Sequence, residues 1–344
     1  MEVLKKKFKA GIIGCGRTLP MHAVPLSVSE EAEISAFCDI KKERAEAAAR
    51  KYGGNAYTDY REMLEDARPD AVHLCVPHYL HPVIAEYAMR HHCSVLSEKP
   101  MAIRLEDAER CVKTAEETGV LYGVIYQCRY NTASRFVKNA LERGKLGKII
   151  SARSTLTWLR SDHYYDDSDW KGTWDKEGGG VVIDQAIHSI DLANWMIGSD
   201  PLYVSAGIAN RGHELISVED SAEGLIRYRN GVDYGFYCMN NYGCDEPIEI
   251  RLLCEKGKAT FSYDEATIVY DDGRTESVAQ ERDDLVYEGG KDYWGFQHRK
   301  QIDQFYRALS GKEPLEITGK EALKIQKIVC AIYESGKTGK KIYF

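Results

Sequence analysis

Short apolar runs alternate with amphipathic segments over the first third of the chain. The apolar runs predict strands at residues 8–14, 33–39, 70–76, 93–98 and 121–127. The segments between them carry spaced apolar positions and many charges, and they predict helices at 40–54, 81–92 and 105–119. Apolar strands that alternate with helices are typical of a parallel sheet covered on both faces. The first part of the chain is therefore predicted to be an α/β domain.

The pattern changes beyond about residue 130. Residues 148–159 predict a long strand, and Asn230-Gly231 and Lys256-Gly257 each lie between alternating runs, as in a hairpin. Two closing helices are expected near 297–311 and 320–336. We therefore predict two domains, 1–128 and 129–344, the second of them α+β with a largely antiparallel sheet.

Composition excludes several classes of protein. The chain has 344 residues and a formal net charge of −7, which argues against a nucleic-acid partner. The first apolar run, residues 10–13, is too short for a signal peptide or a membrane span. Its 10 cysteines include no CxxC pair, so a metal site is not expected. Many free cysteines in a chain of this length indicate a reducing, cytoplasmic location.

A glycine turn follows the first predicted strand. Gly14 and Gly16 would let a pyrophosphate approach the backbone at a helix N-terminus, although Leu19 stands where the usual third glycine would be. Asp39 ends the second strand, where an acid binds the ribose hydroxyls and repels a 2′-phosphate. This favours NAD over NADP. A structural turn beside a surface aspartate is the alternative.

The segment 178–195 combines three glycines, an apolar run and three polar groups. Asp184, His188 and Asp191 are spaced four and three apart, which places them on one face of a helix. The glycines are expected to let the chain pass close to cofactor and substrate. Alternatively, Asp184 is a helix N-cap, His188 is a buried hydrogen-bonded histidine, and Asp191 is structural.

These motifs, together with Glu98-Lys99-Pro100 after the fourth strand, resemble the glucose-fructose oxidoreductase / inositol dehydrogenase / rhizopine-catabolism (Gfo/Idh/MocA) family. The resemblance covers the chain in order, through residues 11–17, 75–85, 98–100, 141–149, 177–192 and 333–340. It implies an N-terminal Rossmann domain that binds NAD. It also implies a C-terminal α+β domain with a large, mostly antiparallel open sheet, through which the chain forms a homodimer or homotetramer. The expected cofactor-binding residues are Gly14, Gly16, Arg17, Asp39, Pro77, His81, Glu98 and Lys99.

Oxidation of a hydroxyl requires a base and a group that stabilises the oxygen. The resemblance places the family's EKP lysine on Lys99 and its DxxxH pair on Asp184 and His188. An imidazole suits the base, because its ordinary pKa lies near ~6.5. The Lys99 cation would hold the hydroxyl oxygen, and Asp184 would orient the substrate or couple to the other two.

Other side chains are candidates for substrate binding. Tyr126 and Arg129 follow the fifth strand of the predicted sheet, at the edge where ligands bind. Aromatic residues of 158–174 would stack on a sugar or simply pack on the sheet. Trp294 and His298 lie at the start of a predicted helix. The substrate-binding candidates are Tyr126, Arg129, Tyr164, Trp170, Trp174 and His298.

The sequence therefore predicts an NAD(H)-dependent oxidoreductase acting on a secondary hydroxyl of a sugar, cyclic polyol or sugar derivative. One alternative is an NAD-retaining glycosidase or isomerase that oxidises a sugar hydroxyl transiently. Another is a non-catalytic regulator that senses dinucleotide. The presence of Lys99, Asp184 and His188 together disfavours the regulator.

Overall fold

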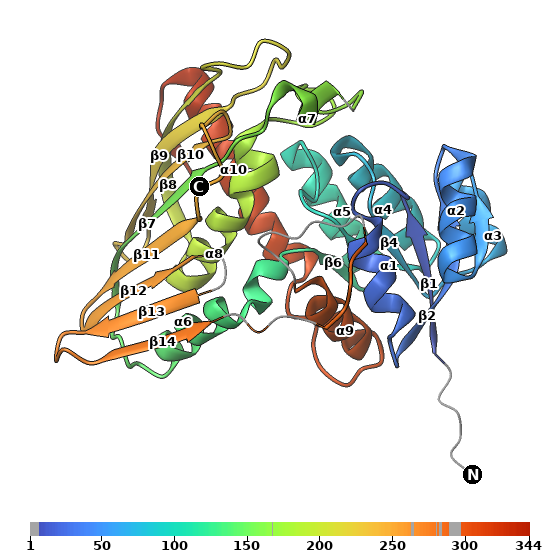
Figure 1. Ribbon diagram of the computed structural model, residues 1–344, viewed down its shortest axis with the longest axis horizontal. Helices are drawn as coiled ribbons and strands as arrows, with labels where there is room; N and C mark the ends of the chain where they lie inside the picture. The colour runs from blue at the N-terminus through green and yellow to red at the C-terminus, as the bar shows by residue number, and fades with distance from the viewer. Residues whose placement is uncertain (1–6, 167, 263–264, 280, 282–283, 289–296) are drawn as a thin grey trace. The chain divides into compact units, whose positions relative to one another are not determined.

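The computed structural model describes residues 7–166, 168–262, 265–279, 281, 284–288 and 297–344. The chain divides into two compact units (Figure 1). The first contains residues 1–127 and 283–323, and the second contains 128–282 and 324–344. Within the described ranges, no helix is both long and apolar enough to cross a bilayer.

The first unit is built on a six-stranded parallel sheet in the order β3-β2-β1-β4-β5-β6. All five predicted strands are present, and the short β3 was not predicted. Its strands are β1 (Phe8–Ile13), β2 (Ala32–Cys38), β3 (Asn55–Tyr57), β4 (Ala71–Leu74), β5 (Ser94–Ser97) and β6 (Tyr122–Val124). Its helices are α1 (Leu19–Ser27), α2 (Lys42–Tyr52), α3 (Tyr60–Asp66), η1 (His78–Leu80), α4 (His81–Arg90), α5 (Leu105–Thr118) and α9 (His298–Leu309).

Glycine ends two of these helices. Gly53 and Gly119 follow α2 and α5 with positive φ, which a residue with a Cβ adopts only with strain. The strands β4 and β5 are buried at every position, as expected of a parallel sheet covered on both faces. This rigid sheet sets the positions of the loops that follow its strands.

Helix α9 belongs to the first unit, although the sequence-based division assigned all of 129–344 to the second domain. Ile302, Phe305 and Tyr306 are fully buried in one cluster with Ala10 and Ile12 of β1. Packing of apolar side chains from distant segments therefore determines this boundary, and no local sequence signal marks it.

The second unit carries a nine-stranded sheet in the order β14-β13-β12-β11-β7-β10-β9-β8-β15. Among the described strands of this sheet, β7 and β10 pair in parallel and the other neighbours are antiparallel. Its strands are β7 (Ile149–Thr157), β8 (Pro201–Ala209), β9 (Ser221–Tyr228), β10 (Asp233–Met239), β11 (Glu249–Cys254), β12 (Gly257–Phe261), β13 (Glu265–Tyr270), β14 (Thr275–Ala279) and β15 (Ile342–Tyr343). The hairpins predicted at Asn230-Gly231 and Lys256-Gly257 are confirmed.

Helices lie against one face of this sheet (Figure 1). Helix α6 packs on β12, β13 and β14, and α8 packs on β7. Burial alternates along β10 and β11, so every second side chain faces the helices and the others face away. The helical elements are η2 (Gln127–Tyr130), α6 (Thr132–Glu142), α7 (Asp162–Asp166), η3 (Val182–Ala186), α8 (Ile187–Ile197) and α10 (Gly319–Thr338), which begins in the first unit.

Candidate functional site

The glycine turn after β1 has the backbone that a dinucleotide requires. Gly14 has a φ of 96°, and a Cβ there would lie 2.3 Å from the carbonyl oxygen of Cys75. Gly16 has no atom within 4 Å of a Cβ position, so the backbone beyond it is open to a ligand. Helix α1 begins at Leu19, and Arg17 is exposed on the turn before it. The turn therefore fits a pyrophosphate at a helix N-terminus.

Asp39 lies beside this turn. Its Oδ2 accepts a hydrogen bond from the Cys15 amide at 2.8 Å, and its Oδ1 accepts from the Lys41 amide at 2.8 Å. The carboxylate is thus fixed at the end of β2, which is the position where an acid meets the ribose of a bound dinucleotide. The residues present fit an NAD cofactor.

The loops after β4 and β5 are joined through His81, the first residue of α4. Its Nδ1 lies 2.6 Å from the Pro100 carbonyl oxygen, and its Nε2 lies 2.8 Å from the Val76 carbonyl oxygen. The ring is fully buried, so His81 holds the two loops together. Pro77 and Lys99 lie in these loops and are half-buried.

Glu98 is buried, and two histidines hold its carboxylate. His22 Nε2 and His298 Nε2 lie 3.0 and 3.1 Å from Glu98 Oε1. Burial alone would raise the pKa of Glu98, but the bonds from both histidines outweigh it and hold the pKa well below its usual range. Among the described residues, only this trio has the geometry of a metal-binding group.

In the second unit, His188 differs from its neighbours on the predicted catalytic helix. Every other residue from 177 to 194 is buried, whereas His188 is half-exposed. The helix begins as a π-helix, η3, and continues as α8. Irregular turns of this kind are frequent at functional sites. An apolar helix thus presents one imidazole at its surface.

The glycines before this helix make room for other parts of the same unit. A Cβ on Gly179 would lie 1.9 Å from the Tyr333 hydroxyl oxygen, and one on Gly180 would lie 1.9 Å from the Glu219 carbonyl oxygen. Close packing inside the unit therefore requires glycine at these two positions. The reason expected from the sequence is a different one, a close approach of cofactor and substrate.

Glu219 caps the helix, and Asp184 does not. The Gly180 and Val182 amides donate to the Glu219 carboxylate at 2.9 and 3.1 Å, and the Tyr333 hydroxyl donates to it at 2.8 Å. An acid at this end also meets the positive end of the helix dipole. Burial raises the pKa of Glu219 to about 7, although these three donors oppose the shift. The N-cap alternative for Asp184 is therefore wrong.

Asp184 instead lies in a buried polar cluster. Its Oδ2 accepts from the Tyr164 hydroxyl at 2.8 Å, from Lys171 Nζ at 3.0 Å and from Gln185 Nε2 at 2.7 Å. Because one oxygen has three donors, the carboxylate is fixed and its negative charge is compensated. This arrangement suits an electrostatic role better than proton transfer.

Lys171 is the main residue that the sequence analysis missed. Burial would lower its pKa, but Asp184, Tyr164 and Glu177 outweigh burial and hold the pKa well above its ordinary range. Burial also raises the pKa of Glu177 to about 7. A lysine inside the aromatic segment at 158–174 was the available signal.

Arg129 and Asp191 form a buried ion pair. Arg129 Nη2 donates to Asp191 Oδ1 at 2.6 Å, and Nε donates to Oδ2 at 2.9 Å. The two side chains are 3% and 0% exposed. The ion pair supports the structural alternative for Asp191, and it engages the guanidinium proposed for substrate binding inside the unit.

The other substrate-binding candidates differ in their surroundings. Tyr126 is fully buried after β6, and its amide donates to Gln301 Oε1 at 3.0 Å. Trp170 and Trp174 are half-buried, and Trp174 Nε1 donates to the Ser217 carbonyl at 2.8 Å. Trp294 lies outside the described residues.

Comparison with known proteins gives a family and several relatives. Residues 8–126 match the GFO/IDH/MocA oxidoreductase family with an NAD-binding Rossmann fold, and residues 134–260 match the GFO/IDH/MocA C-terminal domain. The 1,5-anhydro-D-fructose reductase of Ensifer adhaerens is 29% identical over 66% of this chain and 68% of that protein. The myo-inositol 2-dehydrogenase of Thermotoga maritima is 24% identical over 91% of each chain.

A solved structure is similar over nearly the full length. The crystal structure of the WlbA dehydrogenase from Bordetella pertussis, in complex with NADH and UDP-GlcNAcA, is 29% identical. It superposes with a TM-score of 0.85 over 98% of this chain and 99% of that one. Because the family matches cover both units, in the order that the motifs follow, this chain belongs to the Gfo/Idh/MocA family of oxidoreductases with an NAD-binding Rossmann fold.

Proposed function

We propose that this protein is an NAD-dependent dehydrogenase acting on a secondary hydroxyl of a sugar, cyclic polyol or sugar derivative. The observation that carries the proposal is His188, the half-exposed residue of an otherwise buried stretch from 177 to 194. It lies one turn from Asp184, a carboxylate fixed by Lys171 and Tyr164. A histidine presented in this way is a suitable general base.

The cofactor would be held by the first unit. Gly14 and Gly16 would admit the pyrophosphate, and the Asp39 carboxylate would accept hydrogen bonds from the ribose hydroxyls. Arg17 and Pro77 lie in loops at the same edge of the sheet, and His81 is the first residue of the helix that follows there. When bound, NAD exchanges a hydride with the substrate carbon.

The remaining steps depend on side chains of this protein. His188 accepts the hydroxyl proton as the alcohol is oxidised and returns it in the reverse direction. The Lys99 ammonium group holds the hydroxyl oxygen and stabilises its developing negative charge. The cluster of Asp184, Lys171 and Tyr164 fixes the charges beside the base, so that little reorganisation accompanies the reaction.

The relatives support the substrate class. Their names specify a reductase of an anhydro sugar, a dehydrogenase of an inositol and a dehydrogenase in complex with a nucleotide-linked sugar acid. The half-buried Trp170, which the Lys171 cation approaches to 4.8 Å from the ring centroid, offers an aromatic surface of the kind that stacks on a sugar ring.

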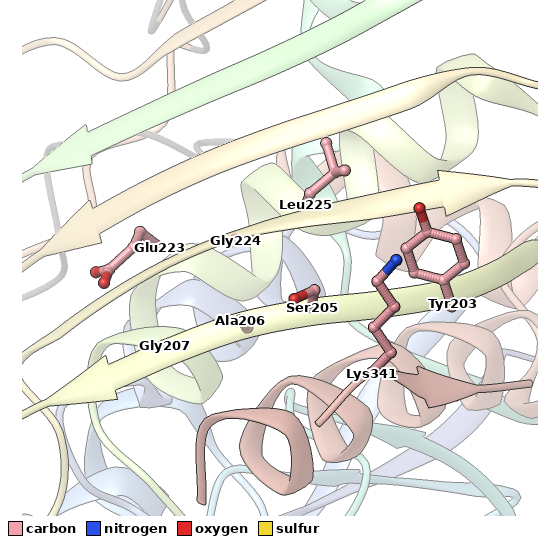
Figure 2. Close-up of a pocket in the computed structure, with 8 residues that line it drawn as sticks. All are labelled: Tyr203, Ser205, Ala206, Gly207, Glu223, Gly224, Leu225 and Lys341. Atoms are coloured by element: carbon pink, nitrogen blue, oxygen red, sulfur yellow. The ribbon is translucent and has the colours of Figure 1, made fainter. Parts of the chain in front are cut away.

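The face of the nine-stranded sheet that points away from α6 and α8 supports a homodimer or homotetramer. Figure 2 shows a shallow hollow on this face, lined by residues of β8 and β9 and by Lys341. Lys341 lies beside Tyr203, and Leu225 and Glu223 lie further along β9, so apolar and charged groups share this face. A broad, mixed face of this kind suits association with a second copy.

We also propose a cytoplasmic location. All ten cysteines are free thiols, and nine of them are partly or fully buried. Such a set of thiols is typical of proteins that work in a reducing compartment.

The function is tested by measuring NADH formation with inositols, hexoses and nucleotide-linked sugars. Lys99→Met and His188→Asn are each expected to lower kcat/KM by ~10²–10⁴-fold, the range of a positioned acid–base group. Lys113→Met and His163→Asn are matched controls, because both side chains are exposed. Turnover by both site variants at the rate of their controls would exclude the proposed roles.

A further inference from the structure

A continuous chain of hydrogen bonds runs through the core of the first unit. The Tyr306 hydroxyl lies 2.9 Å from His73 Nε2, and His73 Nδ1 lies 2.8 Å from His22 Nδ1. His22 Nε2 and His298 Nε2 then meet Glu98 Oε1 at 3.0 and 3.1 Å. These five side chains come from three elements, α1, β4 and α9, and from the loop after β5, and none is more than 8% exposed.

The protonation of these groups determines which atom donates in each hydrogen bond of the chain. An ionised Glu98 only accepts, so His22 and His298 each donate through Nε2. Burial lowers the pKa of His22 and holds that of His73 well below its usual range, so both rings are neutral. His22 Nδ1 is then an acceptor, His73 donates through Nδ1, and the Tyr306 hydroxyl donates to His73 Nε2.

This chain of hydrogen bonds ends at Lys99, the lysine proposed to hold the substrate hydroxyl oxygen. Glu98 Oε2 accepts from the Lys99 amide at 3.3 Å, and the Glu98 amide donates to the Leu74 carbonyl at 2.9 Å. On the other side of the lysine, His81 Nδ1 lies 2.6 Å from the Pro100 carbonyl. The backbone of Lys99 is therefore held on both sides, whereas its side chain is half-exposed.

We propose that Glu98 is a positioning residue for Lys99. His22 and His298 hold Glu98 as a carboxylate, and the chain of hydrogen bonds that begins at Tyr306 orients it. The proposal rests on the proposed function, because it assigns Glu98 an effect on turnover through Lys99. A fixed carboxylate prevents the peptide after Glu98 from rotating and so limits where the ammonium group can lie. A displacement of about 1 Å in a catalytic group costs on the order of 10²-fold in rate.

The same trio could instead bind a divalent metal ion, and this alternative predicts a different proton arrangement. A metal on Nε2 of His22 and His298 would displace both protons. His22 would then donate through Nδ1, His73 would carry its proton on Nε2, and the chain would run toward Tyr306. The tautomer of His73 therefore distinguishes a hydrogen-bonded carboxylate from a metal site.

The first experiment compares Glu98→Gln with Glu106→Gln, an exposed glutamate of the same unit. Glu98→Gln keeps an acceptor for the histidines but removes the charge and offers the Lys99 amide a donor. We expect kcat to fall on the order of 10²-fold while the Kd for NADH and the KM for the substrate stay close to those of the control. A kcat equal to that of Glu106→Gln would overturn the proposal.

Lys99→Met separates this proposal from the proposed function. Loss of turnover in Lys99→Met with normal turnover in Glu98→Gln would refute the positioning role and leave the function standing. Normal turnover in Lys99→Met would refute the role of the lysine itself, and with it the positioning role.

The second experiment uses the unmodified protein, so it does not depend on a variant that folds. NMR of nitrogen-labelled histidines should show His73 protonated at Nδ1 and His22 at Nε2. A proton on His73 Nε2, or a metal ion retained by the purified protein and detected by elemental mass spectrometry, would contradict the proposal.

Discussion

Removal of Asp191 should destabilise the second unit strongly, because it takes away the carboxylate that the buried Arg129 guanidinium binds. Hydrogen bonds of 2.6, 2.9 and 3.2 Å join the two groups, and neither side chain is more than 3% exposed. Breaking a buried pair by removing one partner costs about 3–5 kcal/mol. We therefore expect Asp191→Asn to lower the free energy of unfolding by about that amount.

Urea unfolding followed by tryptophan fluorescence measures this effect near the pair, since the Arg129 guanidinium lies 5.6 Å from the Trp195 ring centroid. Asp162→Asn is the control, because that carboxylate is exposed in the same unit. The double variant Arg129→Met with Asp191→Leu should recover most of the loss, since an apolar replacement of both charges is often neutral or stabilising.

The result also decides between two roles of Arg129. A loss below about 1 kcal/mol in Asp191→Asn would show that the pair is not a buried structural contact, since exposed pairs contribute only that much. An Arg129→Met variant with normal stability and a raised substrate KM would refute our reasoning and restore the substrate-binding prediction.

Three further predictions concern other buried or cofactor-facing groups. Asp39→Ala should weaken NAD binding relative to NADP in fluorescence titrations, and an unchanged ratio would exclude the ribose role. Tyr306→Phe leaves His73 Nε2 without the hydroxyl it contacts and should cost about 1–3 kcal/mol in urea unfolding; no loss would contradict the hydrogen bond between Tyr306 and His73. The pKa of Glu219 is about 7 in the folded protein, against an ordinary 4.5. Protonated Glu219 therefore contributes its full stabilisation to the folded protein below the ordinary pKa, and this stabilisation is lost as the pH rises through the folded-state pKa. The total is on the order of 3 kcal/mol, and the pH slope of stability should be smaller in Glu219→Gln than in the exposed control Glu223→Gln.

Local patterns were sufficient to predict most of the architecture. The strands of the first sheet follow from short apolar runs, and the second-unit hairpins follow from Asn230-Gly231 and Lys256-Gly257, because turns and burial leave a mark within a few residues. The family resemblance supplied what spacing alone does not, which is the assignment of Lys99 and His188.

Contacts between distant residues could not be predicted in this way. Glu98 and His298 are 200 positions apart, and Arg129 and Asp191 are 62 apart. Nothing in either neighbourhood indicates the partner. The three polar residues of the predicted helix face consequently have three different environments: Asp184 lies in a charged cluster, Asp191 in an ion pair, and only His188 reaches the surface.

Direct transfer of hydrogen between the substrate carbon and the nicotinamide is the central claim, and isotope labelling tests it most directly. The first substrate found by the NADH screen would be prepared with deuterium on the carbon of the oxidised hydroxyl. Mass spectrometry of the cofactor after one turnover should find the deuterium in the reduced nicotinamide. Substrate consumption with no deuterium in the cofactor, whether dissociated or extracted from the denatured protein, would contradict the account.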